Sequence, residues 1–217
     1  TKDGETIIDL WGGHADPEKT RPWEKDTIVN VYSTTKTMTA LTALYLADKG
    51  LIDFDAPVAE YWPEFAANGK EKVKVSHLMS HSAGLPGWTE PTDKDMLYDW
   101  DLATSLLAAQ APMWEPGTAP GYHALSQGYL VGEVIRRASG RTVGTVFREE
   151  IAGPLDADFH IGLPASEDAR VADLQPPPAP AGGMSFTSDI KKAAFSNPDI
   201  DVMETRTREW RGAEIPA

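Results

Sequence analysis

Ser33 and Lys36 are the two residues whose types and spacing suggest covalent chemistry. They stand three positions apart in the run Ser33-Thr34-Thr35-Lys36, which is about one helical turn and puts both side chains on one side of a helix. Burial disfavours the charged form of a lysine, so a buried Lys36 could lose its proton near neutral pH and take the proton of the Ser33 hydroxyl. A serine activated in this way is a nucleophile for acyl transfer. The alternative is that Ser33 only caps a helix and Lys36 is solvated.

The residues around this pair predict a short strand followed by a long helix. Residues 28–31 indicate the strand. The polar residues after it open a helix with Ser33 at or very near its N-terminus, where free backbone N–H groups favour negative charge. Lys49 and Gly50 form a typical C-terminal stop. Apolar residues at helical spacing predict the face that this helix buries: Met38, Leu41, Leu44 and Tyr45.

The composition limits the classes of function. The chain has 217 residues, of which 41% are hydrophobic and 24% charged, as expected for a soluble globular protein. Its net charge of −13 argues against nucleic acids and anionic membranes as partners. It has no cysteine, which excludes disulfides, thiol catalysis and thiolate metal sites. No apolar run approaches the length of a membrane span. We therefore expect a soluble protein and take the cytoplasm as its default location.

A second polar segment has Ser76 and Gly84 as the expected cap and stop of a short helix. His77 and His81 lie four positions apart and could face the same way. A zinc-protease helix would need a glutamate directly after the first histidine, and Leu78 stands there instead. We therefore expect structural roles for this segment rather than a metal site.

Tyr122 follows a loop rich in proline and glycine at residues 111–121. Such a loop is stiff and suited to holding one conformation, so it could place the tyrosine accurately. The alternative is an ordinary core or surface tyrosine. The rest of the chain predicts helices over 101–110 and 125–138, the second with Gly140 as its stop, and a further helix capped by Thr142. It also predicts strands at 6–10 and 159–162 and an extended proline-rich segment at 174–183.

Several motifs occur in one order along the chain. A serine and a lysine open a helix, an H-S-A-G-L-P segment follows, and P-G-x-x-P-G-Y precedes an amphipathic helix. This order resembles the serine hydrolases of the penicillin-binding-protein and class C β-lactamase superfamily, and more narrowly the β-lactamase-like carboxylesterases known as family VIII esterases. The resemblance runs from Thr6 to about Pro178. The segments that carry it are Asp9 to Gly13, Ser33 to Lys36, His77 to Pro86, Trp114 to Gly117, Gly121 to Ser126 and Glu149 to Leu155.

The resemblance implies a role for each matching residue. Ser33 would be the acyl-accepting nucleophile, and Lys36 would share and relay its proton. Tyr122 would act as general base in acylation and as proton donor to the leaving group. The Ser33 backbone N–H would be one donor to the oxyanion. The resemblance implies no metal and no cofactor.

The sequence departs from the family at two places. Class C β-lactamases carry an asparagine two positions after the tyrosine, where it contacts the substrate amide, and this chain has Ala124 there. That substitution at a substrate-binding position favours simple esters over β-lactams. The family also closes its site with a late strand bearing a K-T-G, H-x-G or W-x-G type motif, and nothing after Tyr122 fits it. The nearby glycine pair, Gly182-Gly183, has a proline-rich approach unlike a central strand.

We therefore expect an α/β protein of the α+β type, with an antiparallel sheet flanked by helices, as a partial single domain over residues 1–217. A mainly helical region would occupy residues 53–155. The expected activity is hydrolysis of small-molecule carboxylic esters through an acyl-enzyme. The alternatives are a β-lactamase or D-alanyl-D-alanine peptidase, and a non-catalytic penicillin-binding-like module. Because relatives of this family are longer, we also expect the chain to need the missing C-terminal part, supplied as a separate chain.

Overall fold

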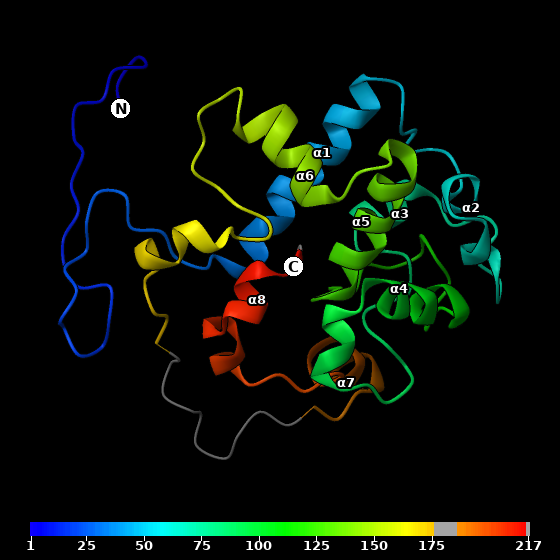
Figure 1. The fold of residues 1–217 in the computed structure, drawn as a ribbon. Coiled ribbons are helices and arrows are strands. Elements are labelled where there is room, and N and C mark those ends of the chain that lie inside the picture. Colours follow the sequence, from blue (N-terminus) through cyan, green and yellow to red (C-terminus); the bar gives the residue numbers. More distant parts are fainter. Residues whose placement is uncertain (176–185, 216–217) are drawn as a thin grey trace.

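The computed structural model describes residues 1–175 and 186–215, and the regular secondary structure of this part of the chain consists of helices joined by long irregular segments (Figure 1). Gly182-Gly183 and most of the expected proline-rich segment lie outside the described residues. The helices are α1 (Thr35–Asp48), α2 (Val58–Tyr61), α3 (Val75–Met79), α4 (Trp100–Ala109), α5 (Ser126–Ser139), α6 (Val143–Phe147), α7 (Asp189–Phe195) and α8 (Arg208–Gly212). Shorter 3₁₀-helical turns lie at Tyr32–Thr34, Pro63–Ala66, Lys94–Tyr98, Ala165–Arg170 and Val202–Arg206, and a π-helical turn at Arg148–Ala152.

Helix α5 is the centre of the molecule. It contacts α1, α2, α3, α4 and α6, and every residue from Ser126 to Ile135 is buried. A helix covered on all sides must satisfy its polar groups internally. Tyr129 does so by donating from its hydroxyl to the Leu97 carbonyl at 2.7 Å. The helix ends at Gly140, whose φ of +71° closes it in the left-handed conformation, as the sequence predicts.

Helix α1 confirms the predicted helix but not its predicted buried face. Leu41 and Leu44 are 41% and 54% exposed, and Met38 and Tyr45 are only partly buried. The side that packs toward α5 and α6 carries mainly small or β-branched residues, which let neighbouring helices come close. A prediction from hydrophobicity alone therefore identifies the wrong side of α1 as its buried face. The buried residues of this helix are Thr39, Thr42, Ala43 and Leu46.

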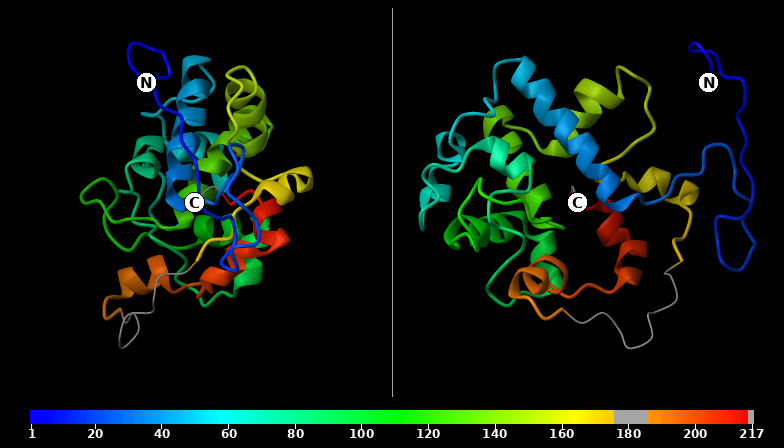
Figure 2. Two further views of the ribbon diagram at one scale, coloured as in Figure 1. Left: turned by 90° about the vertical axis from the view of Figure 1, so that its left-hand side faces the viewer. Right: turned by 180° about the vertical axis from the view of Figure 1, so that it is seen from behind.

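The expected antiparallel sheet is not confirmed. The described residues contain only isolated bridges, one of which joins Ile28 and Val171 in parallel. Residues 6–10, expected as a strand, run as part of an extended arm along the outside of the helices (Figures 1 and 2). Ile8 and Leu10 in this arm are 70% and 87% exposed. A strand exists only when a partner satisfies its backbone groups, and residues 6–10 have none among the described residues.

Glu133 is a buried charge in the middle of α5. Its carboxylate accepts hydrogen bonds from Trp100 Nε1 (2.7 Å), Arg136 Nε (2.7 Å) and Arg137 Nε (2.6 Å). Burial opposes ionisation, but these donors outweigh it and hold the pKa of Glu133 below its usual range. The group ties α4 to α5. Among the described residues, no helix has the length and apolar character that crossing a membrane requires.

Replacing Glu133 with alanine should destabilise the protein by roughly 2–3 kcal/mol, because two arginines and Trp100 lose a buried acceptor. The free energy of unfolding from denaturant titration measures this. The loss should shrink as the pH falls through the carboxyl range, since a depressed pKa contributes stability only above that range. Glu60→Ala, at an exposed carboxylate of α2, is the control and should change stability by less than about 0.5 kcal/mol. Equal effects of the two substitutions would contradict the assignment.

Candidate active site

Ser33 lies in the 3₁₀-helical turn directly before α1, as the sequence predicts, and its side chain is exposed. The preceding residue, Tyr32, has a φ of +45°, a left-handed conformation that costs energy for a residue with a Cβ. The Tyr32 backbone N–H donates to Asn30 Oδ1 at 2.9 Å, and its hydroxyl lies 3.4 Å from Thr205 Oγ1. These contacts hold the sharp turn that presents Ser33 at the start of the helix.

Lys36 lies in the first turn of α1 with its amine beside Ser33. Its Nζ donates to Ser33 Oγ at 3.1 Å and to the Ala124 carbonyl oxygen at 2.6 Å. Burial lowers the pKa of Lys36 to about 8. A minor fraction of the amine is therefore neutral near physiological pH, where an unperturbed lysine is almost fully charged. A neutral amine can accept the Ser33 proton while it still donates to Ala124.

Tyr122 lies next to Lys36 and contacts it through the face of its ring. Lys36 Nζ sits 5.1 Å from the centre of the tyrosine ring, in cation–π contact. Within the described part of the chain, no hydrogen bond joins the Tyr122 hydroxyl to Ser33 or Lys36. Tyr122 is 43% exposed, and its ring stacks on the ring of Phe195 in α7 with 6.4 Å between the ring centres. Ser33, Lys36 and Tyr122 thus lie together, and Tyr122 contacts Lys36 through its ring instead of its hydroxyl.

Ala124 enters the site through its backbone. Its methyl group offers no hydrogen bond to a ligand, while its carbonyl oxygen holds Lys36. Position 124 therefore fixes the amine of the candidate base, a role that the sequence analysis does not predict because any residue type has this carbonyl.

The H-S-A-G-L-P segment differs from its predicted helix bounds. Helix α3 is capped at Lys74 instead of Ser76 and ends at Met79, well before Gly84. Gly84 has a φ of +76°, and a Cβ there would lie 2.6 Å from the Trp114 carbonyl oxygen. The glycine is needed for the close approach of two loops, which sequence alone cannot distinguish from a helix stop.

The same segment holds the loop that delivers Tyr122. Leu85 N–H donates to His123 Nε2 at 3.1 Å, so the proton of the neutral imidazole is on Nδ1, which hydrogen-bonds the Gly121 carbonyl. Burial lowers the pKa of His123 to about 4. Sequence reasoning missed this histidine, although its place between Tyr122 and Ala124 could have drawn attention to it. Three backbone amides of the loop also donate to the segment: Gly121 to His81 (2.9 Å), Gly117 to Ser82 (2.8 Å) and Met113 to Gly84 (2.7 Å).

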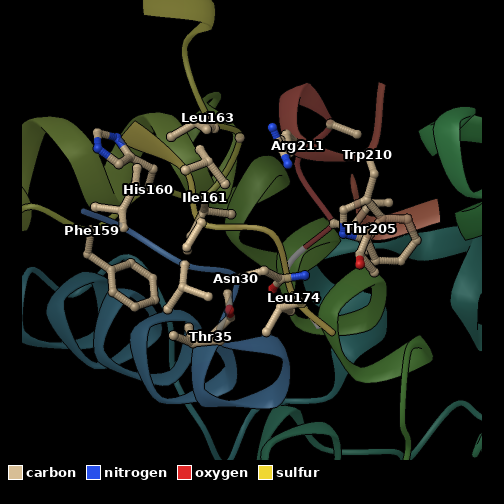
Figure 3. Close-up of a pocket in the computed structure, with 18 of the residues that line it drawn as sticks. Asn30, Thr35, Phe159, His160, Ile161, Leu163, Leu174, Thr205, Trp210 and Arg211 are labelled. Carbon is tan, nitrogen blue, oxygen red and sulfur yellow. The ribbon is translucent and has the colours of Figure 1, made fainter. Parts of the chain in front are cut away.

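A cavity of about 300 Å³ lies beside the turn that precedes α1 (Figure 3). Residues 28–31 and 158–163 form much of its wall. Two segments that were expected as strands therefore line one cavity and do not pair with each other. Arg211 reaches this cavity, and its Nε is buried without a hydrogen-bond partner among the described residues. Its Nη2 lies 3.3 Å from Asp173 Oδ1. Ser33, Lys36 and Tyr122 do not line this cavity.

Comparison with known proteins finds relatives that are named as esterases and β-lactamases. The family model described as Beta-lactamase matches residues 1–213. The chain is 42% identical over 194 residues to Esterase/beta-lactamase LipL of Mycobacterium tuberculosis (strain ATCC 25618 / H37Rv), covering 88% of this chain and 45% of that protein. It is 32% identical over 195 residues to Esterase EstB of Burkholderia gladioli, covering 81% and 49%.

Two solved structures share the fold. A family VIII carboxylesterase is 48% identical, with a TM-score of 0.89 over 97% of this chain and 56% of that chain. A penicillin-binding protein homolog from Caulobacter crescentus is 43% identical, with a TM-score of 0.86 over 94% and 54%. The chain thus spans about half the length of the relatives that it matches.

Lys36 should react with a trace amount of an amine-reactive reagent such as acetic anhydride. Its reactivity should be half-maximal near pH 8, because only the neutral amine is nucleophilic. Peptide mass spectrometry across a pH series measures this. Lys25, whose pKa is raised by its hydrogen bond to Asp9, is the internal control and should react only at higher pH. If both lysines became reactive over the same pH range, a lowered pKa of Lys36 would be excluded.

Proposed function

This chain belongs to the beta-lactamase family, and from that premise we propose that it is a serine hydrolase that cleaves carboxylic esters. The observation that carries the proposal is the contact of Ser33 Oγ with Lys36 Nζ at 3.1 Å, made to an amine whose pKa burial lowers to about 8. A solvated lysine beside a helix-capping serine would keep its ordinary pKa. The names of relatives that include "esterase" support the same activity.

The proposed reaction proceeds through an acyl-enzyme on Ser33. Neutral Lys36 takes the hydroxyl proton as Ser33 Oγ attacks the ester carbonyl, and the new oxyanion accepts a hydrogen bond from the Ser33 backbone N–H. In the proposed steps the Tyr122 hydroxyl takes over this proton from Lys36, against which its ring lies, and passes it to the departing alkoxide. Water then attacks the acyl-enzyme and releases the carboxylic acid and Ser33. No cofactor enters the proposed steps.

Small esters are the preferred substrates in this proposal. An amide side chain at position 124 would contact the amide of a β-lactam, and Ala124 has none. Hydrolysis of β-lactams or of D-alanyl-D-alanine peptides is the second candidate, favoured by the relative named Esterase/beta-lactamase LipL. A non-catalytic module that binds such ligands is the third.

Ser33→Ala should lower kcat for nitrophenyl ester hydrolysis by about 10⁴-fold or more, because the covalent nucleophile is lost. Ser105→Ala, at an exposed serine of α4, is the matched control and should keep full activity. Turnover by Ser33→Ala at the level of the unmodified protein would overturn the proposed nucleophile. Absence of turnover and of fluorophosphonate labelling in the unmodified protein would favour the non-catalytic module.

Nitrophenyl acetate and butyrate should be hydrolysed with a higher kcat/KM than a chromogenic cephalosporin, since a site without a polar partner for the substrate amide gains nothing from that group. Ala124→Asn should raise the relative rate on the cephalosporin. A cephalosporin hydrolysed as efficiently as the simple esters would contradict the preference.

We further propose that a separate polypeptide, equivalent to the part of the relatives that this chain does not match, supplies strands for the expected sheet and the second oxyanion donor. Leu44 of α1 and Leu10 of the N-terminal arm are exposed apolar side chains that such a partner would cover. Denaturing mass spectrometry of active material should therefore detect a second polypeptide besides this chain. Ordinary ester hydrolysis by material that contains this chain alone would contradict the proposal.

A further inference from the structure

His81 occupies a backbone position that usually belongs to glycine. Its φ is +60°, in the left-handed region, just past the end of α3. The His81 N–H points back to the Leu78 carbonyl (3.5 Å), and Ser82 N–H donates to the His77 carbonyl at 2.9 Å. These two bonds form a Schellman motif, in which glycine is preferred because it has no Cβ. A histidine here is strained, and strained positions of this kind concentrate at functional sites.

The ring and the backbone of His81 both contact the residues around Tyr122. His81 Nδ1 accepts the His123 backbone N–H at 3.1 Å, and the His81 carbonyl accepts the Gly121 N–H at 2.9 Å. The imidazole also packs on the Tyr122 ring, with 4.8 Å between ring centres and a 44° tilt. One residue therefore fixes the chain on both sides of Tyr122 and supports its ring.

We propose that His81 is a positioning residue for Tyr122, and that it acts only as the neutral imidazole protonated on Nε2. This inference rests on the proposed function, because it assigns a task to a residue that touches the site without joining the reaction. The His123 backbone N–H is a donor only, so it needs an unprotonated Nδ1. An imidazolium has an N–H on both nitrogens and cannot make this bond.

Burial and the Lys36 cation oppose protonation of His81. Lys36 of α1 is a cation near the ring, Tyr122 and His123 face it from the loop, and His77 is the other titratable group of its own segment. Burial, then Lys36, lowers the pKa of His81 below its ordinary value. His81 is accordingly neutral near pH 7. On acidification below the ordinary histidine range, its protonation removes the bond to His123 and adds a cation beside Lys36, so Tyr122 loses its support.

Three variants separate positioning from a structural role. His81→Gly relieves the backbone strain and removes the ring, so it should keep or raise the melting temperature while kcat falls by about 10- to 100-fold. His81→Asn tolerates the left-handed conformation and keeps an acceptor for His123 N–H, so it should retain more activity than His81→Gly. His14→Asn, at an exposed histidine, is the control and should behave like the unmodified protein.

The first readout is the pH profile of kcat for nitrophenyl acetate from pH 4.5 to 9. All variants should lose activity as Lys36 protonates below about pH 8. The unmodified protein and His14→Asn should show a further loss at lower pH, where His81 protonates, and His81→Asn should lack this second loss because its amide does not titrate. His81→Gly with unchanged kcat and an unchanged acid limb would overturn the proposal.

The second readout does not need activity, and it separates this inference from the proposed function. The His123 backbone amide should shift in a ¹⁵N–¹H NMR titration as His81 protonates, and it should stay in place in His81→Asn. If the chemical shift of the His123 amide does not follow the protonation of His81, the positioning role is overturned even if the protein is an esterase. An amide that follows His81 in a protein without esterase activity supports the contact and refutes only the proposed function.

Discussion

The hydrogen bond from Lys36 Nζ to the Ala124 carbonyl oxygen, 2.6 Å long, is the contact on which the candidate site depends. It joins the first turn of α1 to the chain just before α5, across 88 positions of sequence. A lysine side chain is long and strongly hydrated, so without this acceptor its amine would extend toward water and recover its ordinary pKa. With it, the amine stays buried beside Ser33 and over the Tyr122 ring.

The rest of the architecture keeps that carbonyl in place. Helix α5 is buried along its first ten residues and cannot shift without disturbing five neighbouring helices. The segment after α3 accepts three amides of the loop before Tyr122 and meets His123 through Leu85. The site is therefore held by backbone hydrogen bonds between loops, with few side chains of its own.

Local patterns predicted the parts of this structure that local physics determines. The position of Ser33 before a helix, the end of α5 at Gly140 and the Thr142 cap of α6 all follow from residue types within one or two turns. The buried face of α1 and the expected sheet failed because both depend on partners distant in sequence. The contacts of His81, which the sequence assigns only a general structural role, and the contribution of His123 depend on the same kind of partner: their hydrogen bonds join loops that only the folded chain brings together. The Ala124 carbonyl could not be predicted, since a backbone acceptor leaves no mark in the sequence.

The central claim is that Lys36 makes Ser33 the one strongly nucleophilic serine of this protein. The most direct measurement is to label the protein with a fluorophosphonate, digest it with trypsin and locate the adduct by mass spectrometry. Cleavage after Lys25 and Lys36 isolates residues 26–36, which contain Ser33 as their single serine. The account predicts one adduct per chain, on Ser33. An adduct on Ser80 or Ser82 beside the Tyr122 loop, or none in a protein that hydrolyses esters, would contradict it.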